Sequence, residues 1–129
     1  MRNVILICGP PGSGKTTHAH ELDVDVYDID DDQWNGEPHF AAALTRLATQ
    51  PDAQAAVIRS GATRTARHKT AHLIGATHTV ILDVDADECI RRVRQRARQT
   101  PSMRRQVAAI ADWWSKHEPD LAAHTPRRW

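Results

Sequence analysis

The feature that most constrains the fold of this chain is a glycine-rich octapeptide near its N-terminus. It fits the pattern G-x-x-x-x-G-K-[ST] at every fixed position, and its residues are Gly9, Pro10, Pro11, Gly12, Ser13, Gly14, Lys15 and Thr16. An apolar run at residues 4–8 precedes it, and a helical pattern follows. In this order the three segments predict a phosphate-binding loop (P-loop), because backbone amides and a helix N-terminus converge on one anion.

The end of the P-loop carries the residues with the clearest expected chemistry. Lys15 is expected to reach the β- and γ-phosphates of a bound nucleoside triphosphate as a mobile positive charge. The Thr16 hydroxyl is expected to ligate Mg²⁺. The predicted cofactors are therefore ATP, or another nucleoside triphosphate, and Mg²⁺, held by residues 9–16 and Thr17. The alternative is a glycine turn that binds nothing, and the strand–loop–helix context argues against it.

Strand-like and helix-like segments alternate along the rest of the chain. Strands are predicted at residues 4–8, 24–29, 55–58 and 79–84, and helices at 14–22, 40–48, 65–74, 87–98 and from Thr100-Pro101 onward. The alternation predicts an α/β fold of three layers, with about four parallel strands and helices on both faces. With 129 residues one core is expected, so residues 1–118 are predicted to form one domain and 119–129 a C-terminal tail.

Composition excludes several classes of protein. No apolar run approaches the roughly 20 residues of a membrane span, and the apolar run at residues 4–8 lacks the length and cleavage site of a signal peptide. Cys8 and Cys89 fall in predicted strand and helix, where they are expected to be reduced, buried thiols. We therefore expect a cytoplasmic protein without a membrane partner, whose oligomeric state stays open.

Charge is segregated along the chain although the formal net charge is only +1. Every charged residue from 21 to 37 is acidic, and Asp28, Asp30 and Asp32 alternate at the end of a predicted strand. Ligands of parallel sheets bind at the carboxyl ends of strands. One carboxylate is therefore expected to accept the proton of an attacking hydroxyl, or to hold Mg²⁺ through water. We favour Asp32 as the base, and Asp30 is the second candidate. Asp30 is also the carboxylate expected to help hold Mg²⁺. The alternative is a solvated acidic turn.

Arginines crowd the predicted helix at 87–98, at positions 91, 92, 94, 96 and 98. Arg92 and Arg96 are four residues apart and share a face. Guanidinium groups clamp phosphate in a two-pronged geometry, so we expect one of this pair to stabilise the transferring group from a helical lid. A solvated basic face explains the other arginines. Arg67 and Lys69, on the predicted helix at 65–74, are interpreted as solvated surface residues; the alternative is that they line an acceptor groove.

The P-loop alone does not distinguish ATPases, GTPases and kinases. The chain has no N-K-x-D sequence for reading guanine, and its third predicted strand ends in Val57-Ile58-Arg59-Ser60, without the acid expected in a motor ATPase. These absences, together with the short length of the chain, favour a kinase.

Together the motifs resemble the kinase module of phage polynucleotide 5′-hydroxyl kinase, over about residues 4–114. The resemblance rests on the P-loop, on the aromatic–x–Ile–x–x–Asp segment at 27–32, and on a D-V strand end followed by an Arg-x-x-x-Arg helix. Zeta-toxin-like, gluconate-like and nucleotide kinases share weaker versions. The chain departs from the pattern at Asn35, where the family has arginine, and at Asp31, where it has a basic residue. No fifth strand is predicted.

What the resemblance implies is transfer of the γ-phosphate of ATP to a 5′-hydroxyl end of DNA or RNA, in the host cytoplasm if a phage encodes the chain. It places the base at Asp32, the lid arginine at Arg96 and acceptor contacts near Ser60 and Thr63. Two alternatives stay open: a kinase of a nucleoside, nucleotide or sugar, and a nucleotide-binding regulatory protein with little turnover. Trp34 is the candidate for stacking on a base, whereas Trp114 is expected in the core.

Overall fold

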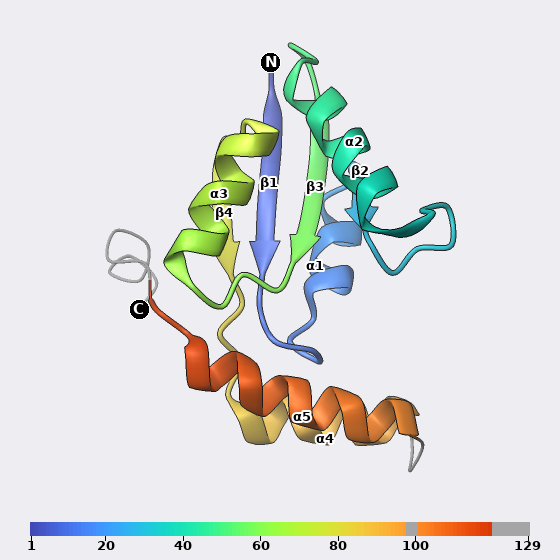
Figure 1. Ribbon diagram of the computed structural model, residues 1–129, viewed down its shortest axis with the longest axis vertical. Helices are drawn as coiled ribbons and strands as arrows, with labels where there is room; N and C mark the ends of the chain where they lie inside the picture. The colour runs from blue at the N-terminus through green and yellow to red at the C-terminus, as the bar shows by residue number, and fades with distance from the viewer. Residues whose placement is uncertain (98–100, 120–129) are drawn as a thin grey trace.

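The computed structural model describes residues 1–97 and 101–119 (Figure 1). Strands and helices alternate through most of the chain and end in two consecutive helices. In order they are β1 (Asn3–Cys8), α1 (Lys15–Glu21), β2 (Asp25–Asp28), α2 (Gly36–Ala48), β3 (Gln54–Arg59), α3 (Arg64–Ile74), β4 (His78–Ile81), α4 (Ala86–Ala97) and α5 (Pro101–Lys116). The four strands form one parallel sheet in the order β2-β3-β1-β4. The strand that leads into the P-loop, β1, therefore lies inside the sheet.

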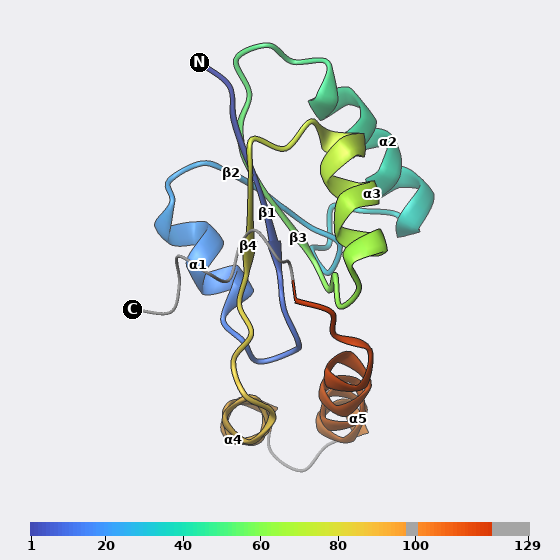
Figure 2. The same cartoon turned by 90° about the vertical axis from the view of Figure 1, so that its left-hand side faces the viewer.

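The sheet is covered on both faces, with α1 on one side and α2 and α3 on the other (Figure 2). Alternation along β3 shows how one strand serves both layers. Ala55 and Val57 pack with α2 and α3, whereas Ala56 and Ile58 pack with α1. Strands buried on both faces need continuous apolar sequences, and this is why the apolar runs predicted them. The expected three-layer α/β fold with four parallel strands is confirmed.

The helices α4 and α5 form a separate pair outside the three layers, and this helical pair lies across the carboxyl ends of the strands (Figure 1). They pack on each other through a small core of their own, built from Cys89 and Val93 of α4 and Met103 and Ile110 of α5. This pair includes α4, which carries the arginines that were expected on a helical lid. No helix in the described residues is long and apolar enough to cross a bilayer.

Element boundaries differ from the predictions by more than one residue at two places. The helix α2 begins at Gly36 rather than near 40, because its first turn is polar and gives no apolar period before Phe40. The strand β4 ends at Ile81 rather than at 84, although the Leu82 amide still donates to the Cys8 carbonyl. The expected cap Thr100, the arginine at 98 and residues 120–129 of the predicted tail lie outside the described residues.

Arg67 is a correction to the sequence analysis, because its side chain is only 1% exposed. Its guanidinium donates to the carbonyls of Gly61, Ala62 and Glu118. Arg67 shares the sheet-facing side of α3 with Ala71 and Ile74, at the helical spacing of four and three residues. The prediction of a surface position was wrong because it followed from the charge of Arg67 and not from its spacing to Ala71 and Ile74.

Glu118 attaches the segment after α5 to the start of α3. Its amide donates to the Ala62 carbonyl, and its carboxylate accepts from the Arg64 amide at the start of α3. Arg67 therefore joins the loop after β3, α3 and the C-terminal segment.

Replacing Arg67 with methionine should lower the free energy of unfolding by about 2–4 kcal/mol, because buried carbonyls lose their donors. Lys69→Met is the matched control, since Lys69 is exposed on the same helix, and it should stay within about 0.5 kcal/mol of the unmodified protein. Urea unfolding followed by circular dichroism measures both. Equal effects of the two variants would contradict the anchoring role.

Candidate active site

The P-loop connects β1 to α1 and lies against α4. Gly12 and Gly14 have φ angles of 80° and 93°, in the left-handed region that favours glycine. A Cβ atom on Gly12 would lie 2.7 Å from the carbonyl oxygen of Cys89. The glycine therefore permits two things at once, the turn of the loop and its close contact with the helical pair.

Lys15 is held at the centre of the P-loop. Its Nζ donates to the carbonyls of Gly9 at 2.7 Å and of Pro10 at 2.9 Å. Burial lowers the pKa of Lys15, and the nearby Cys8 and Asp28 oppose that shift. A buried ammonium is stabilised by anions, so this position suits an incoming phosphate.

Asp28, at the end of β2, faces the start of α1. Its Oδ2 accepts from the Thr16 hydroxyl at 3.3 Å, and its Oδ1 accepts from the Asp30 amide at 3.1 Å. Only 9% of Asp28 is exposed, so both contacts orient a buried carboxylate. Hydroxyl and carboxylate oxygens are the hard ligands that Mg²⁺ prefers, and such sites usually add phosphate oxygens and waters. No group of three or more His, Cys, Asp or Glu side chains that could hold a metal ion occurs in the described part of the chain.

A cavity of about 490 Å³, which we call the P-loop cavity, opens at the carboxyl ends of the strands. The residues expected from the sequence that line it are Gly9, Pro11, Gly12, Gly14, Lys15, Thr16, Thr17, Asp28, Asp30, Ser60 and Arg96. Pro10 and Ser13 are buried within the loop instead. The structure thus brings the P-loop, one end of β2, one end of β3 and α4 to a single cavity.

Asp32 does not line the P-loop cavity and is exposed. The sequence analysis assumed an extended chain through residue 32, and that premise is wrong because β2 ends at Asp28. The Asp31 amide donates back to the Asp28 carbonyl at 3.0 Å, which turns the chain. Only Asp28 and Asp30 of the three alternating carboxylates therefore line the cavity.

The two lid arginines take different positions. Arg96 lines the P-loop cavity, and its Nη2 donates to Oε1 of Gln106 on α5 at 2.8 Å. Arg92 does not line it; its Nη1 donates to the Gly12 carbonyl at 3.3 Å, and its Nε donates to Glu88. Hydrogen bonds from Arg91 and Arg92 lower the pKa of Glu88 to about 2. Arg92 therefore fastens α4 to the P-loop, while Arg96 faces the site.

Trp113 contacts a residue that lines the P-loop cavity, and sequence analysis missed this contact. Its Nε1 donates to the Ser60 carbonyl at 2.6 Å, and the Gly9 amide donates to the same oxygen at 3.1 Å. Trp113 is 3% exposed, whereas Trp114, the tryptophan expected in the core, is partly buried against the α4–α5 core. Both lie near the apolar stripe of α5, and periodicity does not separate neighbours. The hydrogen bond to Ser60 left no signal in the sequence.

Other expected contacts fall outside the P-loop cavity. Trp34 packs against Tyr27 and Phe40, with ring centroids at 6.0 and 5.2 Å, and does not line the cavity. The Thr63 hydroxyl caps α3 by accepting from the Ala66 amide. In their place the cavity gains Ile29, Glu37, Ile58, Arg59 and Gln106, none of which the sequence pattern identified as site residues.

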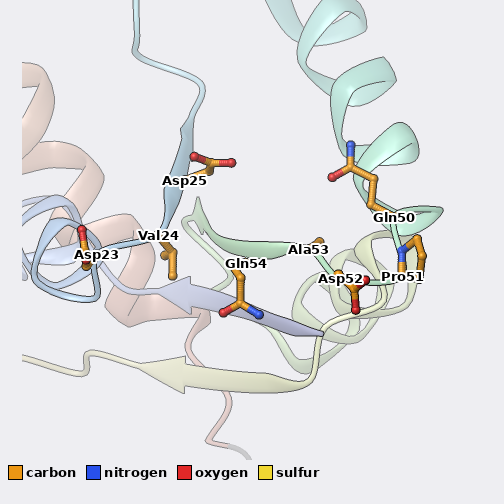
Figure 3. Close-up of a pocket in the computed structure, with 8 residues that line it drawn as sticks. All are labelled: Asp23, Val24, Asp25, Gln50, Pro51, Asp52, Ala53 and Gln54. Atoms are coloured by element: carbon orange, nitrogen blue, oxygen red, sulfur yellow. The ribbon is translucent and has the colours of Figure 1, made fainter. Parts of the chain in front are cut away.

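A second cavity, of about 680 Å³, lies at the opposite end of the sheet (Figure 3). It is lined where β2 and β3 begin, and its charged residues are Asp23, Asp25 and Asp52. Three carboxylates without a lysine or arginine repel phosphate. The candidate site for phosphate chemistry is therefore the smaller P-loop cavity.

No family model matches the sequence, and no curated protein matches it. Several solved structures do match the fold. A gluconokinase from Sinorhizobium meliloti 1021 superposes with a TM-score of 0.67 at 17% identity, over 95% of this chain and 80% of that one. The chain has the P-loop kinase fold.

Two further structures agree with this fold. A shikimate kinase from Acinetobacter baumannii, in complex with shikimate, has a TM-score of 0.54 at 17% identity, over 98% of this chain and 89% of that one. Kti12 from Chaetomium thermophilum, in complex with ADP-AlF3, has a TM-score of 0.58 at 14% identity, over 93% of this chain and 83% of that one.

Gly12→Ala should destabilise the protein more than Gly36→Ala does. Both glycines have left-handed φ angles, 80° and 84°, so both variants carry a backbone cost of about 1–2 kcal/mol. Only the first also meets backbone, since the nearest atom to a Cβ on Gly36 is 3.8 Å away. The extra overpacking should add about 1–3 kcal/mol to the loss of unfolding free energy, measured in urea. Equal losses would contradict the contact between the P-loop and α4.

The Cys8 thiol should make stability fall in alkaline solution. Burial raises its pKa from 9.0 to about 11. Between these values the unfolded thiol ionises while the folded thiol stays protonated, so its contribution is complete below pH 9 and is lost as pH rises toward 11. Comparing the unfolding free energies of the unmodified protein and Cys8→Ala from pH 8 to 10.5 isolates this effect. Their difference should change with pH, and a constant difference would contradict it.

Proposed function

We propose that this protein transfers the γ-phosphate of a nucleoside triphosphate to a hydroxyl acceptor. One observation carries the proposal: a P-loop lysine, a P-loop threonine paired with a buried carboxylate, and an arginine from the helical pair line one cavity. These are Lys15, Thr16 with Asp28, and Arg96. The P-loop kinase fold supports it, because sites of this fold bind phosphate at the same end of the sheet.

On the nucleotide side, Lys15 moves from the loop carbonyls to the β- and γ-phosphates. Thr16 and Asp28 would hold Mg²⁺, directly or through water. When bound, the ion would supply positive charge that offsets the charge of the phosphates. Arg96 stabilises the charge that develops on the transferred group, and Gln106 orients its guanidinium.

On the acceptor side, we assign the general base to Asp30. The acceptor oxygen attacks the γ-phosphorus in line, the bond to the leaving nucleoside diphosphate breaks, and the hydroxyl proton passes to a carboxylate. Asp30 lines the P-loop cavity and is exposed, whereas Asp28 is already held by Thr16. Asp32, the base expected from the sequence, is the second candidate.

For the acceptor, we favour a small molecule. The carboxylates of Asp28, Asp30 and Glu37 are matched by the cations Lys15, Arg59 and Arg96, so the P-loop cavity has no excess of positive charge for a strand of many phosphates. Two of the similar structures are, by name, kinases of gluconate and shikimate. A 5′-hydroxyl end of DNA or RNA is the second candidate, favoured by Arg59, which lines the same cavity and suits a single phosphodiester.

Incubation with γ-labelled ATP, Mg²⁺ and a panel of sugars, sugar acids, nucleosides, nucleotides and 5′-hydroxyl oligonucleotides tests the proposal. Lys15→Met should abolish label transfer, because the phosphates lose their charge partner. Asp30→Asn should lower kcat by about 10²–10⁴, the usual contribution of a general base. Asp32→Asn is the matched control and should change kcat less than about fivefold.

A large loss in Asp32→Asn with little loss in Asp30→Asn would move the base to Asp32. ATP binding without transfer to any acceptor would refute the kinase and favour a nucleotide-binding regulatory protein. Label on oligonucleotides alone would exchange the first and second acceptor candidates.

A further inference from the structure

An arginine that the nucleotide chemistry does not use lies in the P-loop cavity. Arg59, the last residue of β3, lines the cavity together with Glu37 of α2. Its Nη1 and Nη2 donate to the two carboxylate oxygens of Glu37 at 3.4 and 3.3 Å. The guanidinium carbon lies 5.4 Å from the ring centroid of Phe40. Glu37 thus holds the guanidinium in the two-pronged way that carboxylates and phosphates share.

Strand alternation places Arg59 on the side of the cavity away from the Asp28 carboxylate. Along β3, Val57 packs toward α2 and Ile58 toward α1, so Arg59 continues the α2 side. Asp28, at the end of β2, instead faces Thr16 of α1. The P-loop cavity therefore has a nucleotide side at α1 and a separate cationic position at α2.

The Arg59–Glu37 pair is suited to exchange. The Arg59 side chain is 31% exposed, against 62% for Glu37. Ion pairs exposed to this degree contribute little to stability, because solvent screens them and both side chains lose freedom. The arginine is backed by an aromatic ring, whereas its partner extends into solvent. An anion of the same shape can therefore replace the Glu37 carboxylate while Arg59 keeps its place.

We propose that Arg59 binds an anionic group of the phosphate acceptor, and that Glu37 competes with that group for the guanidinium. This inference rests on the proposed function and narrows its substrate class to a hydroxyl compound that carries one carboxylate or phosphate. The acceptor spans the cavity, with its hydroxyl near Asp30 and its anion at Arg59. A sugar acid and a nucleotide end are two sources of the same chemistry.

The test uses pairs of acceptors that differ only in the anion. They are glucose and gluconate, and thymidine and thymidine 3′-monophosphate, with γ-labelled ATP and Mg²⁺. For whichever pair the enzyme accepts, Arg59→Gln should raise the KM of the anionic acceptor by at least about tenfold, because a charge-assisted two-pronged contact is lost. The KM of the neutral acceptor should stay within about twofold. Glu37→Gln should lower the anionic KM about threefold or more, since the competitor is removed. Arg46→Gln, an exposed arginine of α2, should change neither.

The opposite signs separate this role from a structural one. Both variants break the same ion pair, so a pair that merely supports the fold would shift both KM values in one direction and lower the melting temperature of both. That result would overturn the inference. So would equal use of neutral and anionic acceptors that is insensitive to Arg59→Gln, although the kinase proposal would then stand.

Calorimetric titration with gluconate, thymidine 3′-monophosphate and inorganic phosphate gives a readout that needs no transfer. Binding that is lost in Arg59→Gln and strengthened in Glu37→Gln supports the anion site even if no acceptor is labelled, and the kinase proposal alone would then fail. No binding of any of the three anions would overturn the site. The tighter of the two organic ligands shows whether carboxylate or phosphate is the natural group.

Discussion

The structure depends on the position of β1 inside a parallel sheet. Its backbone pairs with β3 on one side and β4 on the other, so the P-loop that follows β1 starts between the ends of these two strands. Parallel strands also end at the same edge, which brings residues more than 40 positions apart to one cavity. The P-loop, the Asp28 carboxylate and the Arg59 guanidinium meet for that reason rather than through any local motif. The acidic cavity at the opposite edge has no such loop.

The sequence predicted the layers and the P-loop well because both follow from local patterns. Continuous apolar runs indicate doubly buried strands, and the octapeptide has one structural solution between a strand and a helix. It predicted the acidic segment less well. Alternation applies only while the chain stays extended, and the turn after Asp28 removes Asp32 from the lining of the cavity.

Residues recruited by tertiary contact gave no signal. Glu37 sits in a polar first turn and Arg59 at a strand end, and only the pairing of β3 with its neighbours, together with the packing of α2, brings them together. Arg67 shows the converse problem, because a charged residue on an apolar face was interpreted by its charge. In both cases the deciding information lies in which groups become neighbours, and a single sequence does not contain it in readable form.

The Ser60 carbonyl has a consequence for how small this fold can become. One oxygen accepts from the first P-loop amide and from the Trp113 indole, so the floor of the site is tied to the last helix. Beyond α5, Glu118 fastens the chain to the start of α3. The helical pair is thus part of the frame that shapes the loop as well as its cover. A chain shortened to the sheet and its three flanking helices would keep every P-loop residue and lose the support that fixes them.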